Sequence, residues 1–173
     1  MNPNVVGRAS EQVAQPDLVR HQERANSEIN GLIAGTRLWT LDGEMPVQYL
    51  SPGDRIITRD TGMALLRQVV LREVRCATVR IRAGSLGHTR PDTDLVLPAS
   101  QPVLVRDWRA EALFGAKEVL VPAARLVDGQ FITRGGHEKL RLIELHFDAP
   151  HILYADGIEI ACGTRQPTAL GVA

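Results

Sequence analysis

The sequence lacks a disulfide framework, a long apolar run and an excess of charge of either sign. Cys76 and Cys162 are the only cysteines among 173 residues, and they are too far apart for a close Cys-x-x-Cys metal or redox pair. Twenty basic residues balance twenty acidic ones, so no overall positive charge favours nucleic acid or an anionic membrane as a partner. No stretch reaches the ~18 apolar residues of a membrane span, and the first residues do not have the pattern of a signal peptide. The cysteines do not fix the compartment, and the missing signal peptide and membrane span favour the cytoplasm. No cofactor is expected.

The composition is that of a folded protein with one main domain, because 44% of its residues are apolar and 23% are charged. Residues 1–30 are polar and contain all four asparagines, and they are expected to form an N-terminal extension with one helix starting at Asp17. Residues 31–163 form the predicted domain. Residues 164–173 are expected to be a C-terminal tail, and the oligomeric state stays open.

The main domain is predicted to be all-β with one or two short helices. Val, Ile and Thr, which favour strands, account for 36 of the 173 residues. Residues 107–115 predict a helix of two turns, capped by Asp107 and ended by Gly115. Residues 133–137 are interpreted as an exposed loop. Asp42-Gly43, Asp128-Gly129 and Asp156-Gly157 each predict a hairpin, and Ser51-Pro52-Gly53-Asp54 predicts a tight turn, so four reversals of the chain are marked.

Three separated stretches together resemble one known family. They are residues 31–60, which contain Gly35-Thr36 and a Pro-Gly-Asp turn, residues 94–105, and residues 142–163. Leu-Phe-Gly at 113–115, Val-Pro-Ala at 121–123 and Leu-Val-Asp-Gly at 126–129 are similar to further segments of the bacterial members. The sequence thus resembles the Hint (Hedgehog/intein) domains, in particular the bacterial Hint-domain proteins. This resemblance implies a curved β fold made of hairpins.

The resemblance also implies self-cleavage or splicing of the backbone, for which the first residue of the domain must be a nucleophile. That residue receives an acyl group on a sulfur or oxygen atom, so Cys, Ser or Thr is required. Here the position is occupied by Gly31, which has no side chain. Ser27 lies in the extension, and Thr36 matches a residue that the family keeps for its fold. We expect neither to replace the missing nucleophile.

The other catalytic positions that the resemblance implies are also changed. The family's general acid is a histidine at the place of Gln101, and glutamine cannot deliver a proton near neutral pH. His88 is better interpreted as a loop residue. The terminal asparagine of inteins has no counterpart, because Ala161 and Cys162 stand in that region and no asparagine follows Asn30.

Three further groups of residues have a functional and a structural interpretation. His151 matches a family histidine and is retained. Together with His146 and Asp148, His151 could form a zinc site. The favoured interpretation of His151 is a hydrogen-bonded polar residue at the end of a strand. Cys162 and Cys76 are expected to be buried apolar residues, while Arg75 could lower the pKa of the Cys76 thiol. Trp39 and Trp108 are expected to pack in the core or at its edge. The arginines between residues 67 and 90 are expected to form a solvated strand face.

The sequence therefore predicts a Hint-like domain that has lost autoprocessing and is not an enzyme. It is expected to serve as a structural or protein-interaction module with a protein or peptide partner. An active autoprocessing domain with a nonstandard nucleophile is the alternative. A metal-dependent hydrolase around His146, Asp148 and His151 is a third hypothesis.

Overall fold

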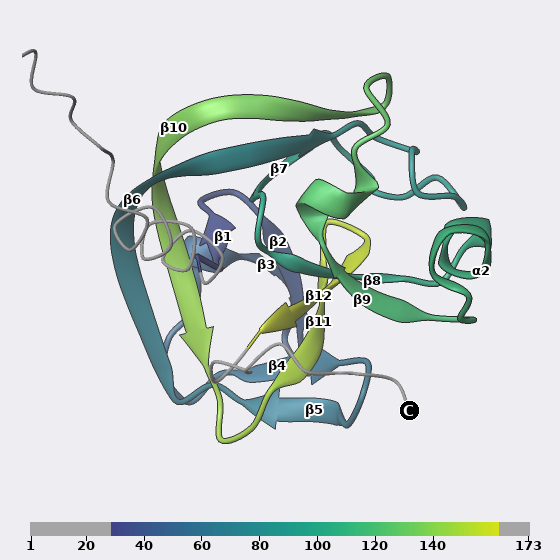
Figure 1. Ribbon diagram of the computed structural model, residues 1–173. Helices are drawn as coiled ribbons and strands as arrows, with labels where there is room; N and C mark the ends of the chain where they lie inside the picture. Colours follow the sequence, from purple (N-terminus) through teal and green to yellow (C-terminus); the bar gives the residue numbers. More distant parts are fainter. Residues whose placement is uncertain (1–28, 163–173) are drawn as a thin grey trace, which may run out of the picture.

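The computed structural model describes residues 29–162. The tail predicted at 164–173 lies outside these residues, and so does the predicted N-terminal helix except for its last two positions. Figure 1 shows that strands are the main elements of the described chain, with one α-helix at the periphery of the molecule. Within residues 29–162 no helix is long and apolar enough to cross a membrane.

The chain forms fifteen elements between residues 32 and 162. Its first half contains β1 (Leu32–Ile33), β2 (Arg37–Thr40), β3 (Gly43–Pro46), the 3-10 helix η1 (Val47–Tyr49), β4 (Arg55–Thr58), β5 (Gly62–Leu65), β6 (Gln68–Ile81) and β7 (Leu95–Pro98). Its second half contains β8 (Pro102–Val105), α2 (Trp108–Phe114), β9 (Val119–Pro122), the 3-10 helix η2 (Ala123–Leu126), β10 (Ile132–His146), β11 (His151–Ala155) and β12 (Ile158–Cys162).

The strands form two sheets of antiparallel strand pairs. The smaller sheet has the order β1-β10-β6-β7, and the larger has the order β3-β2-β4-β11-β12-β8-β9, with β5 beside β4. In Figure 1 the long strands β6 and β10 curve together around the short strands of the larger sheet. The all-β fold expected from the sequence is confirmed.

The core lies between the two sheets, and the alternation of side chains explains which residues enter it. In β10 and the residue after it, Ile143, Leu145 and Phe147 are buried as their alternation predicts. From the other sheet, Leu38, Ile56, Leu153 and Ile160 are fully buried. Burial of these apolar side chains is the main favourable contribution to folding.

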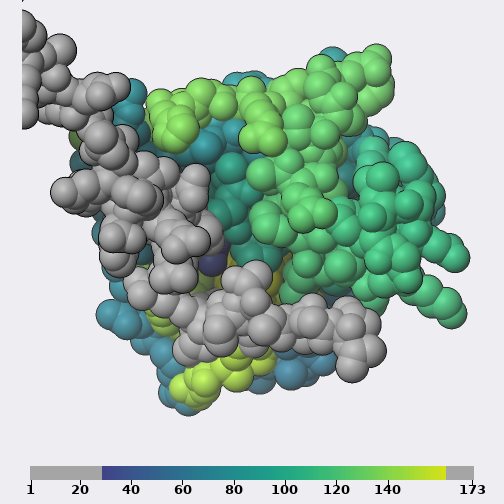
Figure 2. All heavy atoms as spheres, in the orientation of Figure 1, coloured from purple at the N-terminus to yellow at the C-terminus, as the bar shows by residue number. Residues whose placement is uncertain are grey.

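The predicted helix is confirmed as α2. The Asp107 carboxylate accepts a hydrogen bond from the Arg109 amide, and Gly115 ends the helix in the left-handed conformation with φ of 68°. The space-filling view in Figure 2 shows this green-teal part of the chain at one side of the molecule, away from the blue strands β4 and β5.

The structure corrects two of the local predictions. Residues 133–137 are not a loop but part of β10, where the register with β6 shifts between Arg134 and His137. This β-bulge explains the two glycines within a strand. Asp128-Gly129 is not a hairpin, because it joins η2 to β10. The Asp128 side chain instead accepts the amides of residues 130, 131 and 132.

The expectation that both tryptophans pack in the core or at its edge is wrong. Trp108 is 68% exposed and Trp39 is 48% exposed. Trp108 begins α2 on the outside of the molecule, where the Arg109 guanidinium lies 5.0 Å from its ring centre. Trp39 lies between the buried Leu38 and Thr40, so its side chain is on the outer face of β2.

Candidate functional site

Gly31 and Gln101 are directly bonded although 70 residues separate them in the sequence. Gly31 precedes β1, and Gln101 lies in the turn between β7 and β8. The amide nitrogen of Gly31 donates a hydrogen bond of 3.0 Å to Oε1 of Gln101, whose side chain is completely buried. The Ser100 hydroxyl also donates to the carbonyl of Ile29. The turn before β8 therefore holds the start of the domain.

Gln101 also contacts the end of the domain. Its Nε2 atom donates to the carbonyl oxygens of Ala161 at 2.9 Å and of Pro102 at 3.1 Å. Ala161 is in β12, which pairs with β8 at Ile160 and Val103. The structure thus brings Gly31, Gln101 and Ala161 together. Gln101 bonds to main-chain atoms at both ends of the domain.

The backbone at Gly31 has a conformation that other residues rarely adopt. Its φ is 144°, and a Cβ atom placed there would lie 3.1 Å from Cβ of Leu142 and 3.3 Å from the carbonyl oxygen of Ile143. Both contacts are tighter than an ordinary van der Waals distance, and one is with main chain. A nucleophilic side chain therefore does not fit at this position without movement of β10.

Thr36 is buried at the start of β2 and has no part in the cluster around Gln101. Only 2% of the residue is exposed, and its Oγ1 has no hydrogen-bond partner within residues 29–162. Its amide donates to the carbonyl of Ile33, and its carbonyl accepts the amide of Val47. These main-chain bonds fix the chain between β1 and β3. Ser27, the other substitute considered, lies outside the described residues.

His151 is held by a carboxylate that the sequence analysis did not identify. Its Nδ1 lies 3.0 Å from Oδ2 of Asp60 and 3.3 Å from the Thr61 hydroxyl, and Phe147 contacts its ring edge-on. Burial alone would raise the pKa of Asp60, but hydrogen bonds from the Ile152 amide and His151 bring it below its usual value. Asp60 and His151 are 91 residues apart, so no local pattern connects them.

The two cysteine thiols are poor nucleophiles. Cys162 is paired with His151 across β11 and β12. It is partly buried against the core rather than fully buried as expected, and this burial raises the pKa of its thiol to about 12. Cys76 is buried, and its pKa is raised by burial and by the charge of Glu138. The suggestion that Arg75 lowers the Cys76 pKa is wrong, because the charged neighbour that affects the thiol is acidic. Thiolate is the reactive form, so raised pKa values suppress reaction.

The three residues of the hypothetical zinc site are engaged separately. Asp148 pairs with Arg67, whose hydrogen bonds lower the pKa of the Asp148 carboxyl. Nε2 of His146 lies 3.4 Å from Glu144, while His151 is bonded to Asp60. Within residues 29–162 no group of three or more His, Cys, Asp or Glu side chains is placed to hold a metal ion.

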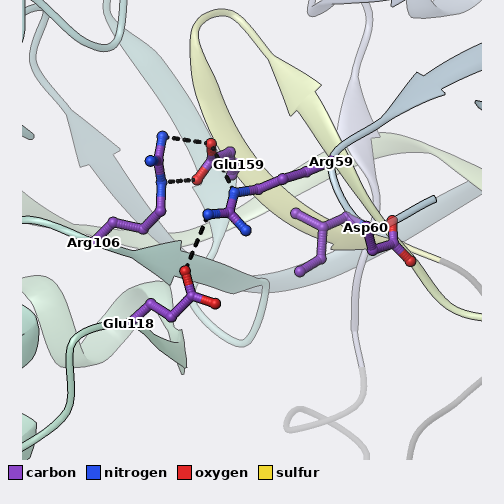
Figure 3. Close-up of polar contacts among 6 residues, drawn as sticks. Arg59, Asp60, Arg106, Glu118 and Glu159 are labelled. Atoms are coloured by element: carbon purple, nitrogen blue, oxygen red, sulfur yellow. Dashed lines mark hydrogen bonds and ion pairs between the residues drawn. The ribbon is translucent and has the colours of Figure 1, made fainter. Parts of the chain in front are cut away.

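A buried carboxylate on β12 is a second feature that sequence reasoning missed. Glu159 is 2% exposed, and Figure 3 shows it between two arginines. Arg106 forms two hydrogen bonds of 2.7 Å with it, and Nε of Arg59 lies 3.3 Å away. Arg59 also pairs with Glu118 at 3.0 Å. The sequence signal for this buried site is the position of Glu159 between two isoleucines of a strand. A carboxylate buried in this way requires a cationic partner.

Comparisons with known structures show which proteins share this fold. A bacterial intein-like domain from Clostridium thermocellum is similar with a TM-score of 0.56 at 14% identity, over 78% of this chain and 98% of that one. The gp41-1 intein matches with a TM-score of 0.50 at 13% identity, over 76% and 98% of the two chains. The zinc-bound splicing domain of the Msm DnaB1 intein gives 0.51 at 17% identity, over 76% and 98%. At these identities the likeness establishes the fold, which is that of the intein-like domains.

The family itself is established from the sequence. A family model described as the Hint domain matches residues 30–163, and the chain therefore belongs to the Hint domain family. No curated protein matches the chain. The resemblance deduced from residues 31–163 is confirmed.

Proposed function

We propose that this Hint domain has lost self-cleavage and serves as a structural and protein-interaction module. The observation that carries this proposal is the bonding of Gly31 by Gln101. The residue that would attack has no side chain, and the residue that would donate a proton is an amide fixed between two main-chain groups. The protein or peptide partner is part of the proposal.

The first step of autoprocessing requires acyl transfer from a main-chain nitrogen to a side-chain sulfur or oxygen. At Gly31 no such atom is present, and the nearby strand β10 leaves no room for one. Among the described residues, Thr36 is buried and Cys162 has a thiol pKa of about 12. These properties argue against the alternative of an active domain with a nonstandard nucleophile.

The second step requires a proton for the departing amide nitrogen. Oε1 of Gln101 accepts a hydrogen bond from Gly31 and can only hold that nitrogen in place. Nε2 of the same side chain binds the Ala161 carbonyl. The arrangement stabilises the meeting point of the two ends of the domain, which supports a structural role.

An exposed apolar sheet face supports the interaction role. Thr40, Ile56 and Ala64 are register partners that face the core from β2, β4 and β5. Their neighbours along each strand therefore face outward. The large apolar residues of this outer face are 37% to 52% exposed: Trp39, Leu41, Met63 and Leu65. The exposed Arg55 of β4 lies on the same face, next to Leu41 and Leu65. Large exposed apolar side chains gathered on one face are typical of protein-interaction surfaces.

The loss of self-cleavage is tested by the mass of the intact protein. Purified full-length chain is incubated with and without a small thiol, which releases thioesters and accelerates N-terminal cleavage in active domains. The expected result is a single 19.0 kDa species under both conditions, while a cleaving intein processed in parallel gives fragments. Fragments that begin at Gly31 would instead support the autoprocessing alternative.

The interaction role is tested with a matched pair of surface variants. Trp39→Ser with Met63→Ser removes two apolar side chains from the outer sheet face, whereas Trp108→Ser removes a more exposed tryptophan from α2. Partners captured from the native source by the wild-type chain should be lost with the first variant and kept with the second. Equal capture by all three chains would contradict an interaction through this face.

A further inference from the structure

The residue pair at the start of the domain, Asn30-Gly31, has a chemical property that the proposed function does not use. In an Asn-Gly pair the main-chain nitrogen of the glycine can attack the side-chain carbon of the asparagine, because glycine has no Cβ to hinder the approach. Among the four asparagines of the chain, Asn30 alone is followed by glycine. The pair is therefore the position in this sequence most susceptible to spontaneous deamidation.

Deamidation of this pair proceeds through a cyclic imide. The Gly31 nitrogen loses its proton to hydroxide and bonds to Cγ of Asn30, while the bond from Cγ to Nδ2 breaks and Nδ2 leaves as ammonia with a proton from water. One water molecule then opens the imide to aspartate or isoaspartate. The reaction thus requires a solvent-accessible N–H at Gly31 and an Asn30 side chain that is free to turn toward it.

The structure holds the attacking nitrogen. Gly31 is buried, and its N–H donates a hydrogen bond of 3.0 Å to Oε1 of the fully buried Gln101. Hydroxide can remove this proton only when the bond opens and the amide reaches solvent, which is the same opening that permits hydrogen exchange. The bond to Gln101 therefore suppresses the first step of deamidation.

The structure also holds the side chain that would be attacked. In the orientation that satisfies its hydrogen bonds, the Asn30 amide donates from Nδ2 to the main-chain carbonyl oxygens of Ile29 at 3.0 Å and of Ser100 at 3.2 Å. The Ser100 hydroxyl donates to the same Ile29 carbonyl. Asn30 is only half-buried, so these bonds, and not close packing on all sides, fix the position of its amide.

The turn that provides these contacts, between β7 and β8, is anchored to other parts of the domain. The Ala99 amide donates to the carbonyl of Ala77 in β6 at 2.9 Å. The Gln101 carbonyl accepts the amide of Ala123, the first residue of η2, at 2.9 Å. Because the turn is bonded to β6 and η2, it does not follow movements of the residues before β1. It can therefore hold the Asn-Gly pair in place.

We propose that Asn30-Gly31 is a latent deamidation site and that the Ser100-Gln101 turn protects it in the folded protein. The turn binds both groups that the reaction needs. Gln101 accepts a hydrogen bond from the nitrogen that would attack, and the Ser100 carbonyl accepts one from the amide group that would leave. Opening of this contact exposes both groups together, so deamidation reports on the attachment of the first residues of the domain.

The product of deamidation cannot restore the original contacts. A carboxylate has acceptors and no donor, so at residue 30 it would face the carbonyl oxygens of Ile29 and Ser100 without a hydrogen bond to either. Isoaspartate also lengthens the main chain by one carbon just before β1. The modification therefore acts in one direction, and Asn30→Asp, which has the aspartate product at this position, should show faster hydrogen exchange at the Gly31 amide than the wild-type protein.

The rate of deamidation at Asn30 tests the proposal with the full-length protein. Wild-type chain is incubated at mildly alkaline pH in native buffer and in unfolding guanidinium chloride, and the peptide that contains Asn30 is analysed by mass spectrometry and an enzymatic assay for isoaspartate. We expect the folded chain to react at least about tenfold more slowly than the unfolded chain, since the contact must first open. This comparison does not depend on the folding of any variant.

Two variants separate the local contact from the stability of the whole fold. Gln101→Leu removes the bond to the Gly31 amide and should deamidate about tenfold faster than wild type in native buffer. Ile56→Ala is the matched control, because it creates a cavity in the core at β4 and leaves the bonds of Gln101 in place. Its deamidation rate at Asn30 should rise much less.

Three results would overturn the proposal. Deamidation of Asn30 in native wild-type protein as fast as in the unfolded chain would show that the turn gives no protection. An equal increase in Gln101→Leu and Ile56→Ala would assign the protection to global stability. Fragments that begin at Gly31 would show cleavage of the main chain in place of deamidation. This last result would also contradict the proposed loss of self-cleavage, which the first two leave intact.

Discussion

The side-chain oxygen Oε1 of Gln101 lies 3.0 Å from the main-chain nitrogen of Gly31. This bond occupies the place where the family resemblance implies contact between a general acid and a scissile peptide. Oε1 of Gln101 only accepts a hydrogen bond from this peptide nitrogen, and a glutamine amide does not deliver a proton near neutral pH. The structural value of this contact can be measured.

Replacing Gln101 with leucine should strongly destabilise the protein. Leucine has a similar volume but leaves the buried Gly31 amide and Ala161 carbonyl without this partner. We expect the free energy of unfolding to fall by roughly 2–4 kcal/mol, measured by urea denaturation. Hydrogen exchange at the Gly31 amide should also become faster.

Gln48→Leu is the matched control for this experiment. Oε1 of Gln48 accepts the Gly35 amide at 2.8 Å, but on the surface, where water can replace it. Its loss should cost less than about 1 kcal/mol. Equal losses of stability in the two variants would contradict a special role for the buried glutamine.

A methyl group at position 31 should be sufficient to disturb the fold. In Gly31→Ala the new Cβ meets Leu142 and Ile143, and the φ of 144° is unfavourable for alanine. The free energy of unfolding should decrease by roughly 1–3 kcal/mol. Gly136→Ala is the control, because nothing lies within 4 Å of its Cβ position and its φ is not in the glycine region. If Gly31→Ala left the free energy of unfolding unchanged, a side chain would fit at this position.

Neutralising Glu159 should cost more than neutralising its neighbour in the same network. Glu159→Gln removes the charge that two arginines share at a position with 2% exposure (Figure 3). We expect a loss of roughly 1–3 kcal/mol in the free energy of unfolding, since Arg59 and Arg106 can partly recover solvent contact. The Glu118 side chain is 53% exposed, and Glu118→Gln should change the free energy of unfolding by about 0.5 kcal/mol or less. A larger loss of stability for Glu118→Gln than for Glu159→Gln would contradict the importance of the buried carboxylate.

Asp156→Asn should stabilise the protein at neutral pH. The pKa of Asp156 is raised in the folded state above the ordinary 3.8 by burial and by the charges of Glu44 and Asp92, so ionisation opposes folding at every pH above the folded pKa. Asparagine keeps the acceptor for the Arg37 amide and tolerates the φ of 47° at this turn. The gain should disappear as the pH falls through the folded pKa to below 3.8, because the aspartate is then protonated in both states.

Asp60→Asn should have the opposite sign and serves as the control for this pH series. The pKa of Asp60 is lowered in the folded state, so its charge contributes stability above pH 3.8 that is lost as the pH falls through the folded pKa. Thermal unfolding between pH 3 and pH 7 gives both comparisons. Parallel pH profiles for the two variants would contradict the opposite environments described for these carboxylates.

The order of turns, strands and short motifs along residues 31–163 was enough to deduce the fold family from the sequence. The same reading identified the helix at Trp108–Phe114, because its cap residues act locally. It failed at residues 133–137, where pairing with β6 draws a glycine-containing segment into a strand. It also failed for Trp39, because which face of β2 is covered depends on the rest of the sheet.

The amino-acid sequence alone shows which residues occupy the positions that are catalytic in the family. Gly31 and Gln101 cannot attack or protonate a peptide, and no asparagine follows Asn30, whatever the chain's conformation. Three relationships arise only when the chain folds: Gln101 joins both ends of the domain, Asp60 holds His151, and acidic residues meet beside Thr36. These contacts join residues far apart in the chain, and no local periodicity encodes them because they arise from the packing of two sheets.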